Sequence, residues 1–461
     1  MVATLAVYAV MLAATVGGFF LIRARGETLT APVPSVAAAT ADNAPTTIKP
    51  TNDALFHVLL ALAAVVVTGR LLGTLFTRIG QPPVIGEVIA GIVLGPSLLG
   101  RIAPEASAYL LPQSVAPYLG IIAQLGVILY MFTVGLELDT SHLRQRGHTA
   151  LAISHASIIA PFLLGALLAL GIYPTLSSRD VPFTVFALFL GVAMSITAFP
   201  VLARILTDRK MTQTPLGVVA LTCAAIDDVT AWCLLALVVG VAQASIGSAV
   251  KVFALTLGYV ALMFLVVRPV IARFAPRFEN GPPSQTWMAA MFVGLLISAL
   301  TTELIGIHAI FGAFLAGAVI PHDSLAAREL IRKLEDIVAT LLLPAFFAFT
   351  GMRTQIGLVS GFEQWLLCGL IITVATLGKF GGTLAAARLT GLGWRESSAL
   401  GILMNTRGLM ELIVLNVGLD LGVISPTVFA MMVLMALVTT LATTPILRLL
   451  NPSLNYPVTR D

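Results

Sequence analysis

The sequence predicts an all-α polytopic membrane protein, and two observations carry that prediction. Of the 461 residues, 58% are hydrophobic and only 10% are charged, and the mean hydropathy is +0.98. Soluble globular domains do not have this composition. The apolar runs are continuous rather than alternating with polar residues, which indicates transmembrane helices and not the strands of a β-barrel.

The N-terminal part of the chain is expected to differ from the rest. The apolar residues 1–25 predict an extra N-terminal helix or a leader, and the absence of a basic start favours the helix. Residues 26–53 are rich in Ala, Thr and Pro and predict a flexible extramembrane linker. We then expect a membrane domain over residues 54–450 and a short cytoplasmic tail over residues 451–461.

About thirteen apolar spans follow the linker. Their approximate bounds are 54–75, 82–99, 117–137, 149–173, 183–206, 215–243, 250–275, 286–303, 306–320, 334–351, 362–387, 397–419 and 425–449. Lys and Arg gather in the loops on one side of these spans, together with the C-terminus, and the positive-inside rule makes that side cytoplasmic. We therefore expect a multi-pass protein of the cell inner (plasma) membrane. The net charge of +4 comes from these loops and indicates no nucleic-acid partner.

Two short motifs recur in the same order in the two halves of the chain. The segment Gly86–Pro96 resembles Gly312–Pro321, and Phe132–Gly135 resembles Phe349–Gly351. The paired spans are an odd number of positions apart, so the two copies face opposite ways across the membrane. Inverted repeats are typical of secondary transporters, whose site lies at the bilayer midplane between broken helices. The repeats are expected over residues 82–243 and 306–449.

Asp227 and Asp228 lie side by side in the middle of an apolar run. One ionised Asp at the bilayer centre costs roughly 2.5–3.5 kcal/mol. Two adjacent carboxylates also repel each other, so we expect one of them to hold a proton or a bound cation. The pair is either a buried structural pair satisfied by hydrogen bonds or a proton and cation site, and the cost of burial favours the site.

Lys379 is the one lysine well inside a predicted span. A buried ammonium without a partner would lose its proton, so we expect it to pair with one carboxylate of the Asp pair. The other carboxylate can then hold a monovalent cation or a proton, but not both. This competition, combined with alternating access, is sufficient for exchange.

Two spans carry polar interruptions at matching positions of the two halves, at residues 195–200 and 404–411. Proline lacks an amide hydrogen, and Asn with Gly weakens a regular helix, so both segments predict broken helices. For Pro200 alone, a simple kink is the alternative. The residues predicted at the crossover of the broken helices are Pro200, Asn405, Thr406 and Gly408, and the hydroxyls predicted at the ion site are Ser195 and Thr197.

Three further charged residues are expected to compensate charge around the site. Arg407 and Glu411 are four residues apart on one helix face and can pair with each other, which favours a structural pair. Glu87 either lines the pathway or pairs with Arg407.

The segments Gln81–Pro96, Ala225–Asp228 and Asn405–Leu412 resemble the monovalent cation:proton antiporters of the second family. This family includes sodium or potassium/proton exchangers and is related to the plant cation/proton exchangers. The resemblance covers roughly residues 55–450. It implies a dimerisation domain and a mobile core domain that work as an elevator, usually in a homodimer.

The resemblance also assigns roles to individual residues. It implies that Asp228 carries the Na+ or K+ ion and the proton. Asp227 is implied to be bridged to Lys379 in the proton-loaded state, and Thr197 to lie at the helix crossover. The partners expected are the cation, the proton, the lipid bilayer and a second copy of the chain, with no cofactor and no enzymatic activity.

Two other functions remain as alternatives. A sodium-coupled symporter of the same general fold requires a polar cavity for an organic anion, for which the sequence offers little. A cation channel would not explain Lys379. An intramembrane aspartyl protease is set aside, because adjacent residues point about 100° apart on a helix and cannot share a proton across a scissile bond. The choice between sodium and potassium stays open.

Overall fold

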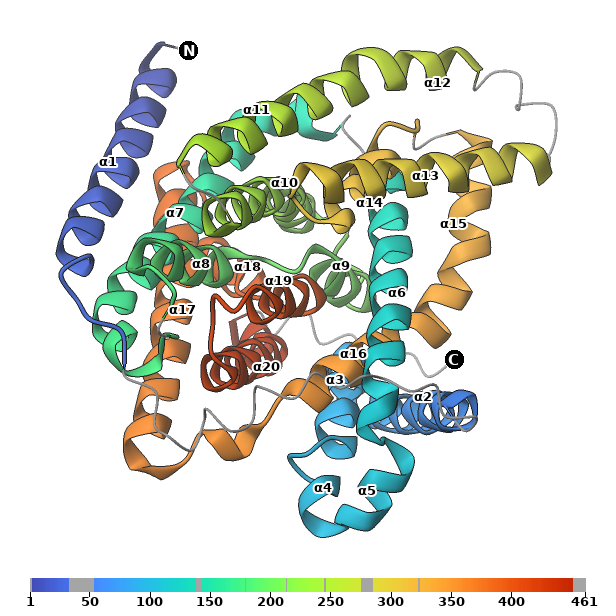
Figure 1. Cartoon of the computed structure of the whole chain (residues 1–461). Coiled ribbons are helices and arrows are strands. Elements are labelled where there is room, and N and C mark those ends of the chain that lie inside the picture. The colour runs from blue at the N-terminus through green and yellow to red at the C-terminus, as the bar shows by residue number, and fades with distance from the viewer. Residues whose placement is uncertain are drawn as a thin grey trace.

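The computed structural model describes residues 2–32, 54–137, 142–178, 180–212, 214–243, 246–274, 285–321 and 324–450. This described part is helical, with irregular connections and no β-strand (Figure 1). The predicted all-α fold is therefore confirmed. Residues 33–53 of the predicted linker and the predicted tail 451–461 lie outside the described residues.

The helices follow one another with short connections. In the first half their bounds are α1 Val2–Gly26, α2 Ala54–Arg78, α3 Pro83–Leu94, α4 Leu99–Ile102, α5 Pro104–Leu110, η1 Gln113–Val115, α6 Ala116–Leu136, α7 His142–Leu176, α8 Phe183–Ser195, α9 Phe199–Asp208 and α10 Pro215–Gln243. In the second half they are α11 Ile246–Leu262, η2 Met263–Val267, α12 Arg268–Phe274, α13 Gln285–Ile305, α14 Ala309–Ala318, α15 Leu325–Ile337, η4 Val338–Leu342, α16 Leu343–Arg353, η5 Ile356–Leu358, α17 Gly361–Leu389, α18 Trp394–Met404, α19 Leu409–Asp420 and α20 Pro426–Leu450.

The predicted spans correspond to these helices. Within the described residues, eleven helical segments are long and apolar enough to cross a membrane, and the bent pair of α18 and α19 makes a twelfth. The shorter apolar helix α14 accounts for the span predicted at 306–320. Each predicted span therefore has a helix or a broken helix in its place.

The motifs that recur in the sequence make equivalent contacts in the structure. Gly91 of α3 lies against α16, where an added Cβ would come within 2.5 Å of the Phe347 carbonyl, and Gly351 of α16 lies directly on Gly91. In the other copy, Gly317 of α14 and Gly135 of α6 lie against each other in the same way. The first helix of each repeat thus packs on the second helix of the other repeat, as a two-fold relation requires.

The helices fall into two groups that pack chiefly within themselves (Figure 1). The first group contains α2, α3, α6, α13, α14 and α16. The second contains α7, α8, α9, α10, α17, α18, α19 and α20, with α1 packed against α7 and α8. Contacts between the groups are sparse by comparison, and α20 supplies some of them by touching α3 and η5. We call these sets the first and the second helix group.

Both broken helices belong to the second helix group, and their interruptions meet. Residues 196–198 separate α8 from α9, and α18 and α19 are inclined by 43° across residues 405–408. The Ala198 amide donates to the Thr406 carbonyl at 2.9 Å. Pro200 lies in the first turn of α9, where a missing N–H costs no helical bond, so it starts the second half-helix rather than kinking a continuous one.

Candidate functional site

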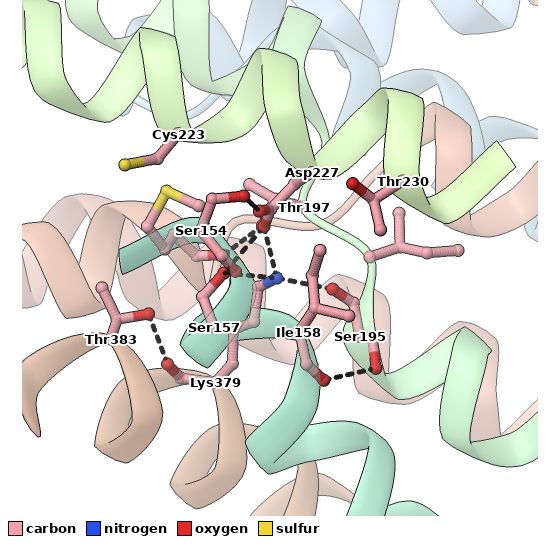
Figure 2. Close-up of polar contacts among 12 residues, drawn as sticks. Ser154, Ser157, Ile158, Ser195, Thr197, Cys223, Asp227, Thr230, Lys379 and Thr383 are labelled. Carbon is pink, nitrogen blue, oxygen red and sulfur yellow. Dashed lines mark hydrogen bonds and ion pairs between the residues drawn. The ribbon is translucent and has the colours of Figure 1, made fainter. Parts of the chain in front are cut away.

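Asp227 of α10 is fully buried and surrounded by hydrogen-bond donors (Figure 2). Ser154 and Ser157 of α7 donate to its two carboxylate oxygens at 2.5 and 2.9 Å. The Thr197 hydroxyl, between α8 and α9, lies 2.9 Å from Oδ2. The Lys379 ammonium of α17 completes the set, with Nζ 2.7 Å from Oδ2. Asp227 therefore has little capacity left for a further ligand.

Lys379 also binds the end of a broken helix. Its Nζ donates to the Ser195 carbonyl at 2.5 Å, and Ser195 is the last residue of α8. A positive charge is favoured at a helix C-terminus, where the final carbonyls lack helical partners. The carboxylate, the helix end and the neighbouring hydroxyls together offset the cost of burying the ammonium, whose side chain is 0% exposed.

Asp228 contrasts with its neighbour. Its side chain is buried, at 4% exposed, yet within the described part of the chain neither carboxylate oxygen has a hydrogen-bond partner. The charged pair of Asp227 and Lys379 and the Phe199 backbone amide act on it, and the Asp228 charge in turn acts on the Tyr130 phenol of α6. A buried carboxylate without a donor is costly, so its oxygens are available to a proton or a cation.

A second buried ion pair lies at the crossover. Arg407, between α18 and α19, pairs with Glu411 at 2.8 Å, and both side chains are 0% exposed. The same guanidinium donates to the carbonyls of Met194 at 2.6 Å and Ala193 at 3.0 Å, at the end of α8. Arg407 therefore ties one broken helix to the other while Glu411 cancels its charge.

Two residues predicted at the site lie differently from the expectation. The Ser195 hydroxyl donates to the carbonyls of Gly191 at 2.7 Å and Ile158 at 3.0 Å, so only its backbone carbonyl contacts Lys379. The pairing of Glu87 with Arg407 was wrong. Glu87 lies against α2 in the first helix group, where Arg70 is the charged side chain that acts on it.

The other residues of the crossover are brought together. The Asn405 side-chain oxygen is buried and has no donor within the described residues. The Thr406 carbonyl accepts the bond from Ala198. Gly408 lies so close to α9 that an added Cβ would stand 2.6 Å from Val201 Cγ2. The described residues contain no group of three or more His, Cys, Asp or Glu side chains that could hold a metal ion.

Ser154 and Ser157 were missed by the sequence reasoning. Their spacing of three residues within an apolar span places both hydroxyls on one face of α7, which is a signal that the sequence contains. Serine in a transmembrane helix often bonds to its own backbone, and Ser157 also lies 2.8 Å from the Ser154 carbonyl. The pattern therefore indicates a polar face and not the group that it binds.

Comparisons with known proteins relate the chain to transporters. The family described as "Sodium/hydrogen exchanger, transmembrane" matches residues 60–449. The chain is 44% identical to Na(+)/H(+) antiporter NhaS4 of Synechocystis sp., over 87% of this chain and 99% of that protein. It is 41% identical to Cation/H(+) antiporter 20 of Arabidopsis thaliana, over 86% and 49%. It is 37% identical to K(+)/H(+) antiporter 1 of Saccharomyces cerevisiae, over 82% and 46%, so the chain spans about half the length of these last two relatives.

A solved structure has a similar fold. The sodium proton antiporter MjNhaP1 from Methanocaldococcus jannaschii at pH 8 superposes with a TM-score of 0.65, over 88% of this chain and all of that chain. The sequence identity is 14%, so this likeness concerns the fold alone.

The buried pair predicts a specific stability pattern. Lys379→Met leaves Asp227 charged and buried without its cation, which is expected to cost about 3–5 kcal/mol. Thermal unfolding in detergent should show a large loss for Lys379→Met and a substantial recovery for Lys379→Met with Asp227→Asn. The control is Lys251→Met, at an exposed lysine of α11. A double variant no more stable than Lys379→Met would contradict the pairing.

Proposed function

The chain belongs to the sodium/hydrogen exchanger family, and from this premise we propose that it exchanges a monovalent cation, Na+ or K+, for H+ across the membrane. The observation that carries the proposal is Asp228, a buried carboxylate without a donor, next to an Asp227 whose charge Lys379 already cancels. The relatives' names, which specify Na+/H+, K+/H+ and cation/H+ antiporters, support exchange and leave the cation open.

The charges of the site explain why proton and cation exclude each other. Asp227 is balanced by Lys379 and Glu411 by Arg407, so an ionised Asp228 leaves one negative charge. Either H+ or one monovalent cation neutralises it. A neutral site crosses a low-dielectric region at a lower cost than a charged one. The site therefore crosses the membrane only with H+ or a cation bound to Asp228, which couples the two ion flows. In the proton-loaded state Asp227 is bridged to Lys379.

The proposed alternating access is of the elevator type, with the second helix group moving against the first. Asp228 and the residues that bind Asp227 all lie in the second group. Near the ends of α16 and α19 a few side-chain bonds join the second helix group to the first. Asn416 of α19 donates to Thr350 of α16 at 2.8 Å and accepts from Arg353 at 3.0 Å, and Arg353 pairs with Asp420 at 2.5 Å. A boundary held by a few exchangeable bonds suits a sliding motion.

The assembly and its membrane are part of the same proposal. We place the protein in the cell inner membrane with a cytoplasmic C-terminus, because its basic residues gather on that side. We propose a homodimer formed through the first helix group, whose helices α2 and α13 expose large apolar side chains. These include Leu55, Leu59, Leu296 and Leu300.

The alternatives receive less support. An organic-anion symporter requires a positive charge for its substrate, whereas Lys379 and Arg407 are both paired with carboxylates. A channel requires no such balanced pairs. The names of the relatives also favour neither a symporter nor a channel.

Exchange and its dependence on Asp228 can be measured together. In proteoliposomes with a pH dye inside and an imposed proton gradient, addition of Na+ or K+ should dissipate the gradient. We expect Asp228→Asn to reduce this response to the background, because an amide cannot alternate between proton and cation. Glu363→Gln, at an exposed carboxylate of α17, serves as the matched control. Exchange by Asp228→Asn at the wild-type rate, or no response of the wild type to either cation, would refute the proposal.

The elevator motion predicts that a bridge between the helix groups stops transport. In a background with the three cysteines replaced by serine, Thr350→Cys with Asn416→Cys should be bridged by Hg2+ across the boundary. Exchange is expected to stop and to return with dithiothreitol. The controls are the single variants Thr350→Cys and Asn416→Cys in the same background, in which Hg2+ has no second cysteine to bridge. Undiminished exchange in the bridged Thr350 and Asn416 variant would rule out this motion.

A further inference from the structure

A buried donor close to the proposed ion site has no partner. The indole Nε1 of Trp232 makes no hydrogen bond to the described residues, although its side chain is only 4% exposed. Trp232 lies on α10, four residues after Asp228, whose two oxygens also lack a donor. Buried polar groups without partners are uncommon in native proteins, and each calls for a physical explanation.

The helix places these two groups together. Residues four apart are neighbours on a helix surface. Long and aromatic side chains on a helix generally lean toward the preceding turn, which for Trp232 is the turn that carries Asp228. The indole N–H can only donate, and an ionised carboxylate can only accept. The two unpartnered groups are therefore complementary in chemistry as well as in position.

We propose that Trp232 is a positioning residue of the exchange cycle, whose N–H stabilises the ionised Asp228 carboxylate through one bridging water. The inference rests on the proposed exchange function. A buried water requires two to four polar partners, and the indole with the two carboxylate oxygens supplies them. The interaction acts after the proton leaves Asp228 and before the cation binds.

Other groups that face Asp228 have different positions or partners. Asp227 and Lys379 form a balanced pair. The Phe199 amide acts on Asp228 from the first turn of α9, and the Tyr130 phenol of α6, in the first helix group, is close enough for the Asp228 charge to act on it. Tyr130 is the competing side-chain donor, and Tyr130→Phe therefore belongs in the test.

The test is the pH profile of exchange in proteoliposomes for Trp232→Phe, which keeps a ring and removes the N–H. A less stabilised carboxylate holds its proton to a higher pH. The midpoint of the profile should therefore move to more alkaline pH by about half a unit to one unit, as loss of one hydrogen bond implies. At a pH below the midpoint the KM for the cation should rise about threefold to tenfold, with little change in the maximal rate. Trp365→Phe, at an exposed tryptophan of α17, is the control.

A second pair of variants keeps the test decisive if Trp232→Phe does not fold. Trp232→Gln and Trp232→Met have side chains of similar length, and only Gln retains an N–H. The Gln variant is expected to have its midpoint closer to wild type than the Met variant. An unshifted midpoint, with or without a lower rate at every pH, would overturn the inference, as would a shift seen only in Tyr130→Phe. In each case wild-type exchange leaves the proposed function standing, whereas absence of wild-type exchange removes both.

Discussion

The Lys379–Asp227 ion pair is the interaction on which the rest of the site depends. Two opposite charges remain buried in a low-dielectric interior only where further hydrogen bonds satisfy them. Here α7 contributes two serines, the α8–α9 interruption contributes Thr197, and the end of α8 contributes a carbonyl. The pair thereby joins α7, α10, α17 and a broken helix. Because it cancels one carboxylate of the Asp pair, it also leaves Asp228 as the group whose charge is unbalanced.

The broken helices require positive charge for a related reason. A helix that stops inside the membrane leaves carbonyls without partners, and water is absent to satisfy them. Lys379 and Arg407 both donate to the last turn of α8. Each of these cations in turn has its own carboxylate. The interruption and the two ion pairs are therefore one structural unit, and the ion site is built upon it.

Much of the fold was predictable because lipid imposes strict rules on sequence. Continuous apolar runs predicted the spans. The recurring glycine motifs predicted the repeat, and in the structure these glycines are points of close helix contact, as between Gly91 and Gly351. The cost of an unpaired ammonium led to the Asp pair as the partner of Lys379, but only the resemblance indicated which of the two carboxylates it is. Ser154 and Ser157 were missed because a hydroxyl in a span commonly bonds to its own backbone. The pairing of Glu87 with Arg407 was wrong because the sequence does not reveal which face of α3 meets the crossover. Val84 and Val88 lie there beside Arg407, whereas Glu87 lies against α2.

The most direct test of the account is proton release on cation binding, measured without transport. The purified protein in detergent and weak buffer, with a pH indicator, receives Na+ or K+ in increments. Competition for one carboxylate predicts that the bound cation displaces protons, that release decreases toward alkaline pH, and that lower pH weakens cation binding. Saturable cation binding that releases no protons at any pH would contradict the central claim that proton and cation share Asp228.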